Sequence, residues 1–306
     1  MTPGINRMKT WILIAAMGGL FVLVGAWIGG SQGALVALAI GLAFNAAMYW
    51  YSDKIAIATT RSKPVTEADY PQLYRIVGEL AKERAMPLPA IFVSDMAQPN
   101  AFATGRDPQH ASVAVTKGIL QLLDERELRG VLAHELSHVT NRDILISSIA
   151  AAIGMSITFL ARFALFFGGG DDNRGGGFGI LFAWILAPIA AAIIQMAVSR
   201  SREYQADESG AYLSKDPDAL ANALRKLESA TRQVPPPRSV SPAEAHLFIV
   251  NPMAALRGNG GFGNLFSTHP PTAQRIERLD AIAHELRGGS PLPRPPAGQD
   301  GPFHPA

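Results

Sequence analysis

The stretch HELSH places His134 and His138 four residues apart, with Glu135 beside the first histidine. On a helix, residues four apart lie on one face, so both imidazoles can bind the same ion. This HExxH pattern is typical of zinc-dependent hydrolysis of peptide bonds, with the glutamate as general base on the attacking water. A surface helix carrying two unrelated histidines is the alternative. The motif predicts a zinc site with His134 and His138 as ligands.

A catalytic zinc site needs a third protein ligand and one open position. The chain contains no cysteine, so its ligands must be histidines or carboxylates. In REYQADE, Glu203 is the natural third ligand. Asp207 lies one turn later on the same face and can fix the tautomer of a ligating histidine. An ordinary solvated carboxylate pair is the alternative for this motif.

Four segments are apolar enough to cross a bilayer, which takes about 20 helical residues. They are residues 11–28, 34–51, 144–167 and 179–198. A cleaved signal peptide is the alternative for the first, and buried core helices for the others. HELSH precedes the third segment as closely as Glu203 follows the fourth. A hairpin of those two spans would therefore bring the predicted ligands together.

Lysine and arginine residues gather at one side of these four spans, which the positive-inside rule assigns to the cytoplasm. We therefore expect both termini to be cytoplasmic, with the zinc within about two helical turns of that interface. Charged residues make up only 17% of the chain, against about a quarter in typical domains, as membrane spans require. The net charge of +2 gives no basic field that would favour nucleic acid.

The chain is expected to divide into five parts. These are a transmembrane hairpin (1–52), a first cytosolic part (53–143), a second transmembrane hairpin (144–198), a second cytosolic part (199–287) and a disordered tail (288–306). Asn45, inside the second span, is interpreted as a helix-packing hydrogen bond rather than a functional site.

The cytosolic parts contain signals for both helices and strands. Thr66 can cap a helix with acidic residues in its first turn, and Asp124 can cap the helix that carries HELSH. Residues 90–95 and 111–118 have the composition of strands, with a third short strand within 98–105. Three later helices are predicted from their apolar spacing: about 201 through the 210s, 217–231 and 273–286.

Together these motifs resemble the HtpX-type membrane zinc metalloproteases, relatives of the CAAX prenyl endopeptidases. The similar stretches are PNAFATG, VLAHELSHVTNRD, REYQADESGA and STHPPTAQRIERL, which stand in the family's order. The resemblance implies a mainly α fold, with four transmembrane helices and a cytosolic α+β gluzincin-type domain containing a small edge-exposed sheet. It implies one Zn²⁺ held by His134, His138 and Glu203, with Glu135 as general base and acid.

The resemblance also implies a substrate site. Asn100, Ala101 and Phe102 would lie on an edge strand above the zinc, where an extended substrate could pair through main-chain hydrogen bonds. His269 would donate to the developing oxyanion, although a structural histidine before the last helix is the alternative. Arg275 would support that segment.

By resemblance, the chain is an ATP-independent zinc endopeptidase of the bacterial inner (plasma) membrane with a cytoplasmic active site. Its expected role is quality control under heat shock and other stress, with unfolded or damaged membrane proteins and the lipid bilayer as partners, and no nucleic acid or nucleotide. A CAAX-type processing protease, an intramembrane protease with its motif inside the bilayer, and a zinc-binding membrane chaperone are the alternatives.

Overall fold

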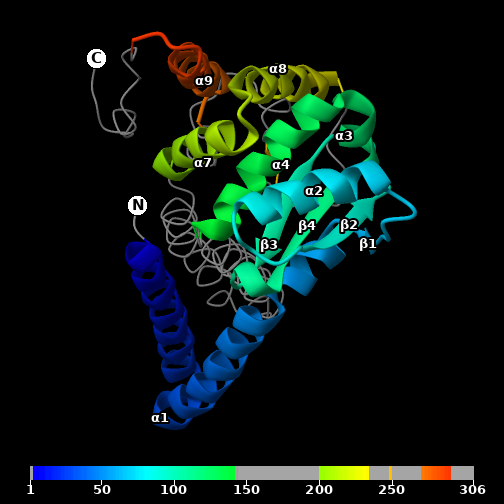
Figure 1. Ribbon diagram of the computed structural model, residues 1–306. Helices are drawn as coiled ribbons and strands as arrows, with labels where there is room; N and C mark the ends of the chain where they lie inside the picture. The colour runs from blue at the N-terminus through cyan, green and yellow to red at the C-terminus, as the bar shows by residue number, and fades with distance from the viewer. Residues whose placement is uncertain (1–2, 142, 144–199, 234–247, 250–269, 291–306) are drawn as a thin grey trace.

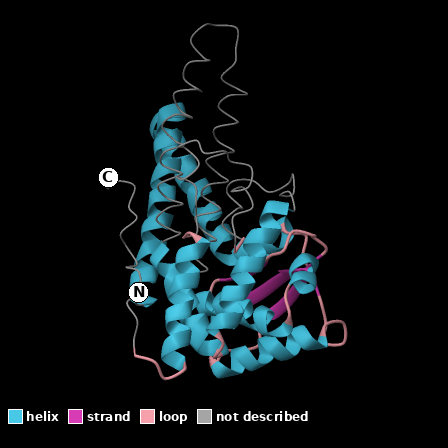
Figure 2. Ribbon diagram, turned by 90° about the horizontal axis from the view of Figure 1, so that it is seen from above, coloured by secondary structure: helices cyan, strands magenta, loops and turns pink. Residues whose placement is uncertain are grey.

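The computed structural model of the 306-residue chain describes residues 3–141, 143, 200–233, 248–249 and 270–290. The third and fourth predicted spans, 144–167 and 179–198, lie outside the described residues, as do His269 and the tail beyond residue 290. Helices make up most of the described chain, and the small sheet is set among them (Figure 2).

The chain begins with α1 (Pro3–Thr59), whose two arms are joined at Gly29 and Gly30 (Figure 1). Gly30 has a φ of 59°, a left-handed conformation that favours glycine. The arms contact each other: Asn45 Nδ2 donates to the carbonyl of Ile14 at 3.3 Å. The interpretation of Asn45 as a packing residue is therefore confirmed.

The surface of α1 is strongly apolar. Among the described residues, Gly29–Tyr51 is the one helical stretch long and apolar enough to cross a membrane, judged by length and composition. It overlaps the second predicted span, 34–51. The side chains exposed on α1 include Trp11, Ile12, Leu23, Leu35, Val36, Ile40, Leu42 and Trp50. Such a surface suits lipid better than water, while the four-span arrangement stays a prediction.

A four-stranded mixed sheet follows α1. Its strands are β1 (Lys63–Pro64), β2 (Ala90–Ser94), β3 (Ala101–Gly105) and β4 (Ala111–Thr116), in the order β1-β2-β4-β3. β2 and β4 are parallel, whereas β3 runs antiparallel to β4 and forms an edge. Three strands match the predicted segments; β1 is only two residues long and leaves no periodic signal.

Different elements cover the two faces of this sheet. α2 (Pro71–Glu83) and α4 (Glu125–Thr140) share one apolar core with β2, β3 and β4. On the other face, Ala56 and Ile57 at the end of α1 pack against Phe102 and Ala114 (Figure 1). The edge strand β3 is therefore held between the helix that carries HELSH and the end of the apolar helix.

The start of α2 differs from the prediction. The helix begins at Pro71, not directly after Thr66. The main-chain N–H and the hydroxyl of Thr66 both donate to the Asp69 carboxylate, at 3.1 and 2.6 Å, and close a separate turn. Pro71 then supplies the first helical residue, a position where its missing N–H costs nothing.

The predicted cap of α4 is confirmed. Glu127 N–H donates to Asp124 Oδ1 at 2.9 Å, and Asp124 N–H donates to Glu127 Oε2 at 3.0 Å, which completes a capping box. The ammonium of Lys226 also donates to Glu127, at 2.7 Å. The start of the HELSH helix is thus fixed by its own residues and by a neighbouring helix.

Three later helices follow: α7 (Arg200–Ser214), α8 (Pro217–Gln233) and α9 (Thr272–Leu286) (Figure 1). α7 and α8 pack against α4, and α9 packs against α7 and α8. Their bounds match the three predicted helices within a few residues. The predicted apolar face of α8 is buried through Leu220, Leu224 and Leu227. A short helix, α3 (Lys117–Leu122), and a 3₁₀ turn (Pro108–His110) complete the described elements.

The α8 face offers a test of the core. Leu224 is fully buried, so Leu224→Ala should lower the free energy of unfolding by about 2–5 kcal/mol. Leu88 is 52% exposed, and Leu88→Ala should change the free energy of unfolding by less than about 0.5 kcal/mol. Denaturant unfolding in detergent micelles measures both. Equal effects of the two changes would show that α8 does not belong to the cooperative core.

Candidate metal centre and active site

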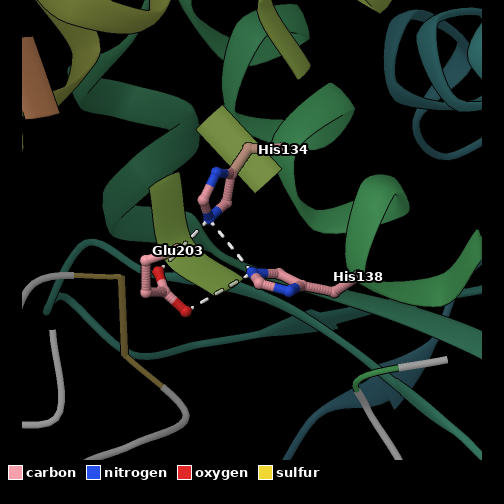
Figure 3. A group of neighbouring side chains, drawn as sticks. All are labelled: His134, His138 and Glu203. Atoms are coloured by element: carbon pink, nitrogen blue, oxygen red, sulfur yellow. Dashed lines mark hydrogen bonds and ion pairs between the residues drawn. The ribbon is translucent and has the colours of Figure 1, made fainter. Parts of the chain in front are cut away.

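Three side chains from two helices converge at one point (Figure 3). His134 and His138 lie on α4, and Glu203 lies on α7. The two Nε2 atoms are 3.3 Å apart, and Glu203 oxygens lie 3.7 Å from His134 Nε2 and 3.6 Å from His138 Nε2. The structure thus brings together the three residues that the sequence predicts as ligands.

The geometry of this group fits a tetrahedral ion. Zinc binds histidine nitrogens at about 2.0–2.1 Å, so two nitrogens on one tetrahedral ion lie about 3.3–3.4 Å apart. The two Nε2 atoms have this spacing, and one donor atom from each residue lies within 4.8 Å of the others. Two histidines and a carboxylate are also a typical donor set for catalytic zinc. His134, His138 and Glu203 could therefore hold a zinc ion.

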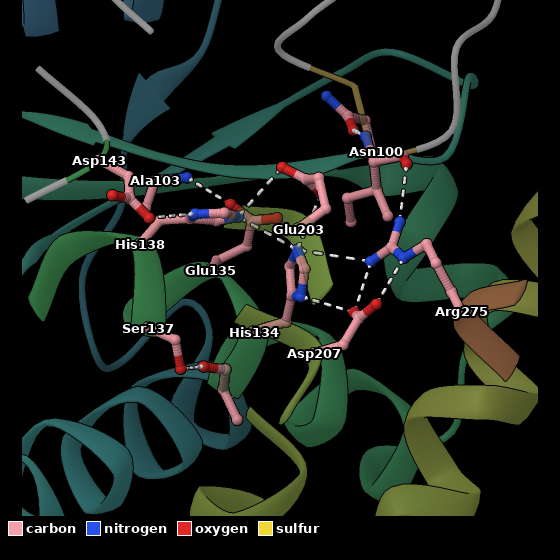
Figure 4. A network of polar contacts seen from close by, with 12 residues as sticks. Asn100, Ala103, His134, Glu135, Ser137, His138, Asp143, Glu203, Asp207 and Arg275 are labelled. Carbon is pink, nitrogen blue, oxygen red and sulfur yellow. Dashed lines mark hydrogen bonds and ion pairs between the residues drawn. The ribbon is translucent and has the colours of Figure 1, made fainter. Parts of the chain in front are cut away.

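A buried chain of polar groups orients His134 (Figure 4). Its Nδ1 lies 2.9 Å from Asp207 Oδ1. Arg275 of α9 donates to both oxygens of Asp207, from Nε at 2.8 Å and from Nη2 at 2.7 Å. An N–H at Nδ1 leaves the Nε2 lone pair directed at the centre. The structure thus places Asp207 beside the second nitrogen of His134, and Arg275 is bound directly to Asp207.

His138 has a similar partner that the sequence prediction did not include. Its Nδ1 lies 3.3 Å from Asp143 Oδ2, and Asp143 N–H donates to the carbonyl of His138 at 3.0 Å. Asp143 is buried, in the turn that follows α4. The available signal was an acidic residue five positions after His138, in HVTNRD. Each histidine thus has a carboxylate at its second nitrogen.

Burial and these carboxylates set the charge of the histidines. Burial alone would lower the pKa of His134, but Asp207 and Glu203 raise it from 6.5 to about 9. Burial also opposes protonation of His138, whereas Asp143 and Glu203 raise its pKa above the ordinary value. In the absence of an ion, the carboxylates therefore favour protonated imidazoles, so a metal ion must displace protons.

Glu135 lies between the two histidines and points toward the sheet (Figure 4). Its Oε2 accepts a hydrogen bond from the main-chain N–H of Ala103 in β3 at 3.0 Å. Burial raises the pKa of Glu135 above its ordinary value, although the two histidines lower it. A carboxylate with a raised pKa beside a metal centre is suited to accept a proton and release it again.

The predicted substrate residues have buried side chains. Asn100 Oδ1 accepts from the N–H of Ile249, and Phe102 packs against α1. Thr116 N–H donates to the carbonyl of Asn100. In an antiparallel pair of strands, every second residue forms main-chain hydrogen bonds with the partner strand, so Phe102 and Thr104 are also bonded to β4. The main-chain groups of Ala101 and Ala103 therefore point away from β4, toward the sheet edge that β3 forms among the described residues. Any role of this strand in binding substrate thus belongs to its main chain.

Close packing of α4 against α7 sets the distance between the ligands. A Cβ at Gly210 of α7 would lie 2.8 Å from His134 N and 2.9 Å from its Cα, so only glycine fits. Behind this contact, Arg84 Nη2 donates to Ser137 Oγ of α4 at 3.3 Å and to the carbonyl of Ser209 of α7 at 3.0 Å. Both features hold the two ligand-bearing helices together.

A metal centre of two histidines and a glutamate, with a carboxylate base beside it, defines the class of metallopeptidases. Comparison with known proteins agrees: the family model of peptidase family M48 matches residues 67–283. Protease HtpX homologs from Pelotomaculum thermopropionicum and Syntrophobacter fumaroxidans are each 49% identical over 285 residues, which is 91% and 90% of this chain and 99% of each relative. A Protease HtpX homolog from Burkholderia mallei is 50% identical over 286 residues, covering 92% of this chain and 99% of the relative.

The fold is also similar to the crystal structure of S. mikatae Ste24p, with a TM-score of 0.51 and 21% identity, covering 91% of this chain and 66% of that one. The chain therefore belongs to peptidase family M48, with relatives of the HtpX type, and is a metalloprotease. The predicted family is confirmed.

The packing at Gly210 leads to a prediction. Gly210→Ala should separate α7 from α4 and lower zinc affinity about 10- to 100-fold, since it displaces a ligand. Gly78→Ala is the matched control, because a Cβ there meets its nearest atom at 3.9 Å. Competition with a zinc chelator measures both. Unchanged affinity in Gly210→Ala would mean that the helices need not approach so closely.

The raised pKa of His134 predicts pH-dependent zinc binding. Zinc requires a neutral imidazole, so its affinity should fall as the pH drops below about 9, with release of a proton on binding. In the metal-free protein, protonated His134 stabilises the fold below pH 6.5, and this contribution is lost as the pH rises through about 9. Zinc titrations between about pH 6.5 and about pH 8.5 test the first statement. A pH-independent affinity would contradict it.

Proposed function

We propose that this chain is an integral membrane zinc endopeptidase that cleaves misfolded or damaged membrane proteins at the cytoplasmic face of the bacterial inner membrane. The observation that carries the proposal is the convergence of His134, His138 and Glu203 beside Glu135, next to the free edge of β3. Membership of peptidase family M48 supports the reaction, and the apolar surface of α1 supports the membrane.

In this proposal, His134, His138 and Glu203 hold the zinc. When bound, the ion would polarise the scissile carbonyl and the attacking water. Glu135 takes a proton from that water as the new C–O bond forms, and then delivers it to the amine as the peptide C–N bond breaks. His269 is proposed to donate to the oxyanion.

The free edge of β3 supports an extended, poorly folded substrate. Main-chain hydrogen bonds to a sheet edge discriminate little between side chains. The buried side chains of Asn100, Ala101 and Phe102 leave the main chain as the binding surface. Pairing with this edge needs an extended segment whose N–H and C=O groups are unpaired, which an unfolded chain offers along much of its length, so the edge favours unfolded segments.

The distribution of basic residues supports the proposed topology of four spans with both termini in the cytoplasm. In this arrangement, the end of α1 lies at the cytoplasmic interface, and β3 packs directly against it. Segments of membrane proteins that leave the bilayer on this side would meet the strand edge close to where they emerge.

One alternative deserves a direct comparison. A CAAX-type processing protease, related to the HtpX type, is the alternative; the likeness to S. mikatae Ste24p, at 21% identity, shows the fold alone and does not decide between the two. A prenylated CAAX peptide and an unfolded membrane protein should therefore be offered to the same enzyme. Preference for the prenylated peptide would favour processing over quality control.

The role of Glu135 provides the main test. Glu135→Gln should keep one zinc per chain but lower cleavage of unfolded casein by about 10²- to 10⁴-fold, the usual contribution of general acid–base catalysis. Glu203→Ala should instead lose zinc, measured by mass spectrometry. Comparing new protein N-termini in cells with wild-type or Glu135→Gln enzyme would identify substrates.

Three outcomes would contradict the proposal. Equal cleavage by wild type and Glu135→Gln would exclude Glu135 as the base, and a protective effect on membrane proteins that survives this change would favour a zinc-binding chaperone. Unchanged zinc content in Glu203→Ala would place the third ligand elsewhere.

A further inference from the structure

One main-chain group links the sheet edge to the base. The antiparallel ladder pairs Phe102 with Ala114 and Thr104 with Ser112. These pairs lie two and four residues from Asn100, whose carbonyl accepts from Thr116 N–H, so they are the hydrogen-bonded pairs. The N–H of Ala103 therefore points away from β4, and it donates to Glu135 Oε2 at 3.0 Å.

This contact restrains an otherwise free carboxylate. Glu135 projects from α4 on three rotatable bonds, and its side chain is nearly buried. In the part of the chain that the structure describes, Ala103 N–H is the hydrogen-bond donor to this carboxylate. The donor itself is fixed, because Ala103 is held in β3 by bonded pairs on both sides. A hydrogen bond to one oxygen orients the plane of the carboxylate and leaves the second oxygen directed elsewhere.

We propose that the main-chain N–H of Ala103 is a positioning group for Glu135, which holds one carboxylate oxygen while the other exchanges the proton with the reacting water. This inference rests on the proposed function, because it assigns Glu135 as the base. It divides the edge of β3 between two tasks. Ala101 offers its main-chain groups to substrate, whereas the N–H of Ala103 serves the enzyme's own carboxylate.

The test removes this N–H and nothing else. In the zinc-loaded full-length enzyme, Ala103 is replaced by lactic acid through nonsense suppression, which turns the amide into an ester. Ala103→Pro is a simpler second variant, since edge strands accept proline where the N–H is outside the ladder. With unfolded casein as substrate, kcat should fall about tenfold or more, as expected for a lost hydrogen bond to a charged group. KM and the zinc content should stay as in wild type.

The matched control is the same ester at Thr104, whose N–H faces β4. It weakens the ladder without touching Glu135, so kcat should stay close to the wild-type value. A higher KM with unchanged kcat in the Ala103 ester would assign the N–H to substrate and overturn the inference. Wild-type kinetics, or loss of zinc in that variant, would overturn it as well. Failure of the proposed function is seen separately, as equal activity of wild type and Glu135→Gln.

Discussion

The close contact between α4 and α7 is the constraint on which the rest of the site depends. Glu203 reaches the two histidines only because the helix backbones approach closely enough to exclude a Cβ at Gly210. The contact is supported on two sides: Arg84 joins both helices from α2, and Arg275 joins Asp207 of α7 to α9. Four helices thus fix the position of the Glu203 carboxylate.

This packing creates a problem of buried charge. Burying an ionised group costs several kcal/mol unless it is paired. The buried carboxylates around the centre are Glu135, Asp143, Glu203 and Asp207, and the buried guanidinium groups are Arg202 and Arg275. A divalent cation would balance the two remaining negative charges. In its absence, protonated histidines take that place, which explains why the pKa of His134 is raised despite its burial.

Helix faces that depend on residue spacing could be predicted from the sequence. Site residues whose positions depend on contacts between distant segments could not. The two histidines share a face because they are four residues apart, and the apolar face of α8 follows from similar helical spacing. The capping box of α4 was also visible in the sequence around Asp124. Glu203 could be assigned only by supposing that two apolar segments form a hairpin. Asp143 was signalled only by its acidic type, five positions after His138. Gly210 and the Ala103 N–H carry no local signal, since their roles exist only once other elements pack against them. At Thr66, a turn closed by Asp69 replaced the expected helix start: the hydroxyl that would cap a helix by accepting from a main-chain N–H donates to the Asp69 carboxylate.

The packing of α1 against the sheet brings the end of this apolar helix next to β3, the strand that contacts Glu135. Ile57 of α1 contacts the cluster that contains Phe102, while the residues on either side of Phe102 face the core shared with α4. Successive residues of one strand therefore contact the end of the apolar helix and the helix that carries Glu135. Because successive side chains of a strand point to opposite faces, β3 can pack against α1 through Phe102 while the N–H of Ala103 donates to Glu135. A single strand of five residues thus contacts both the apolar helix α1 and Glu135.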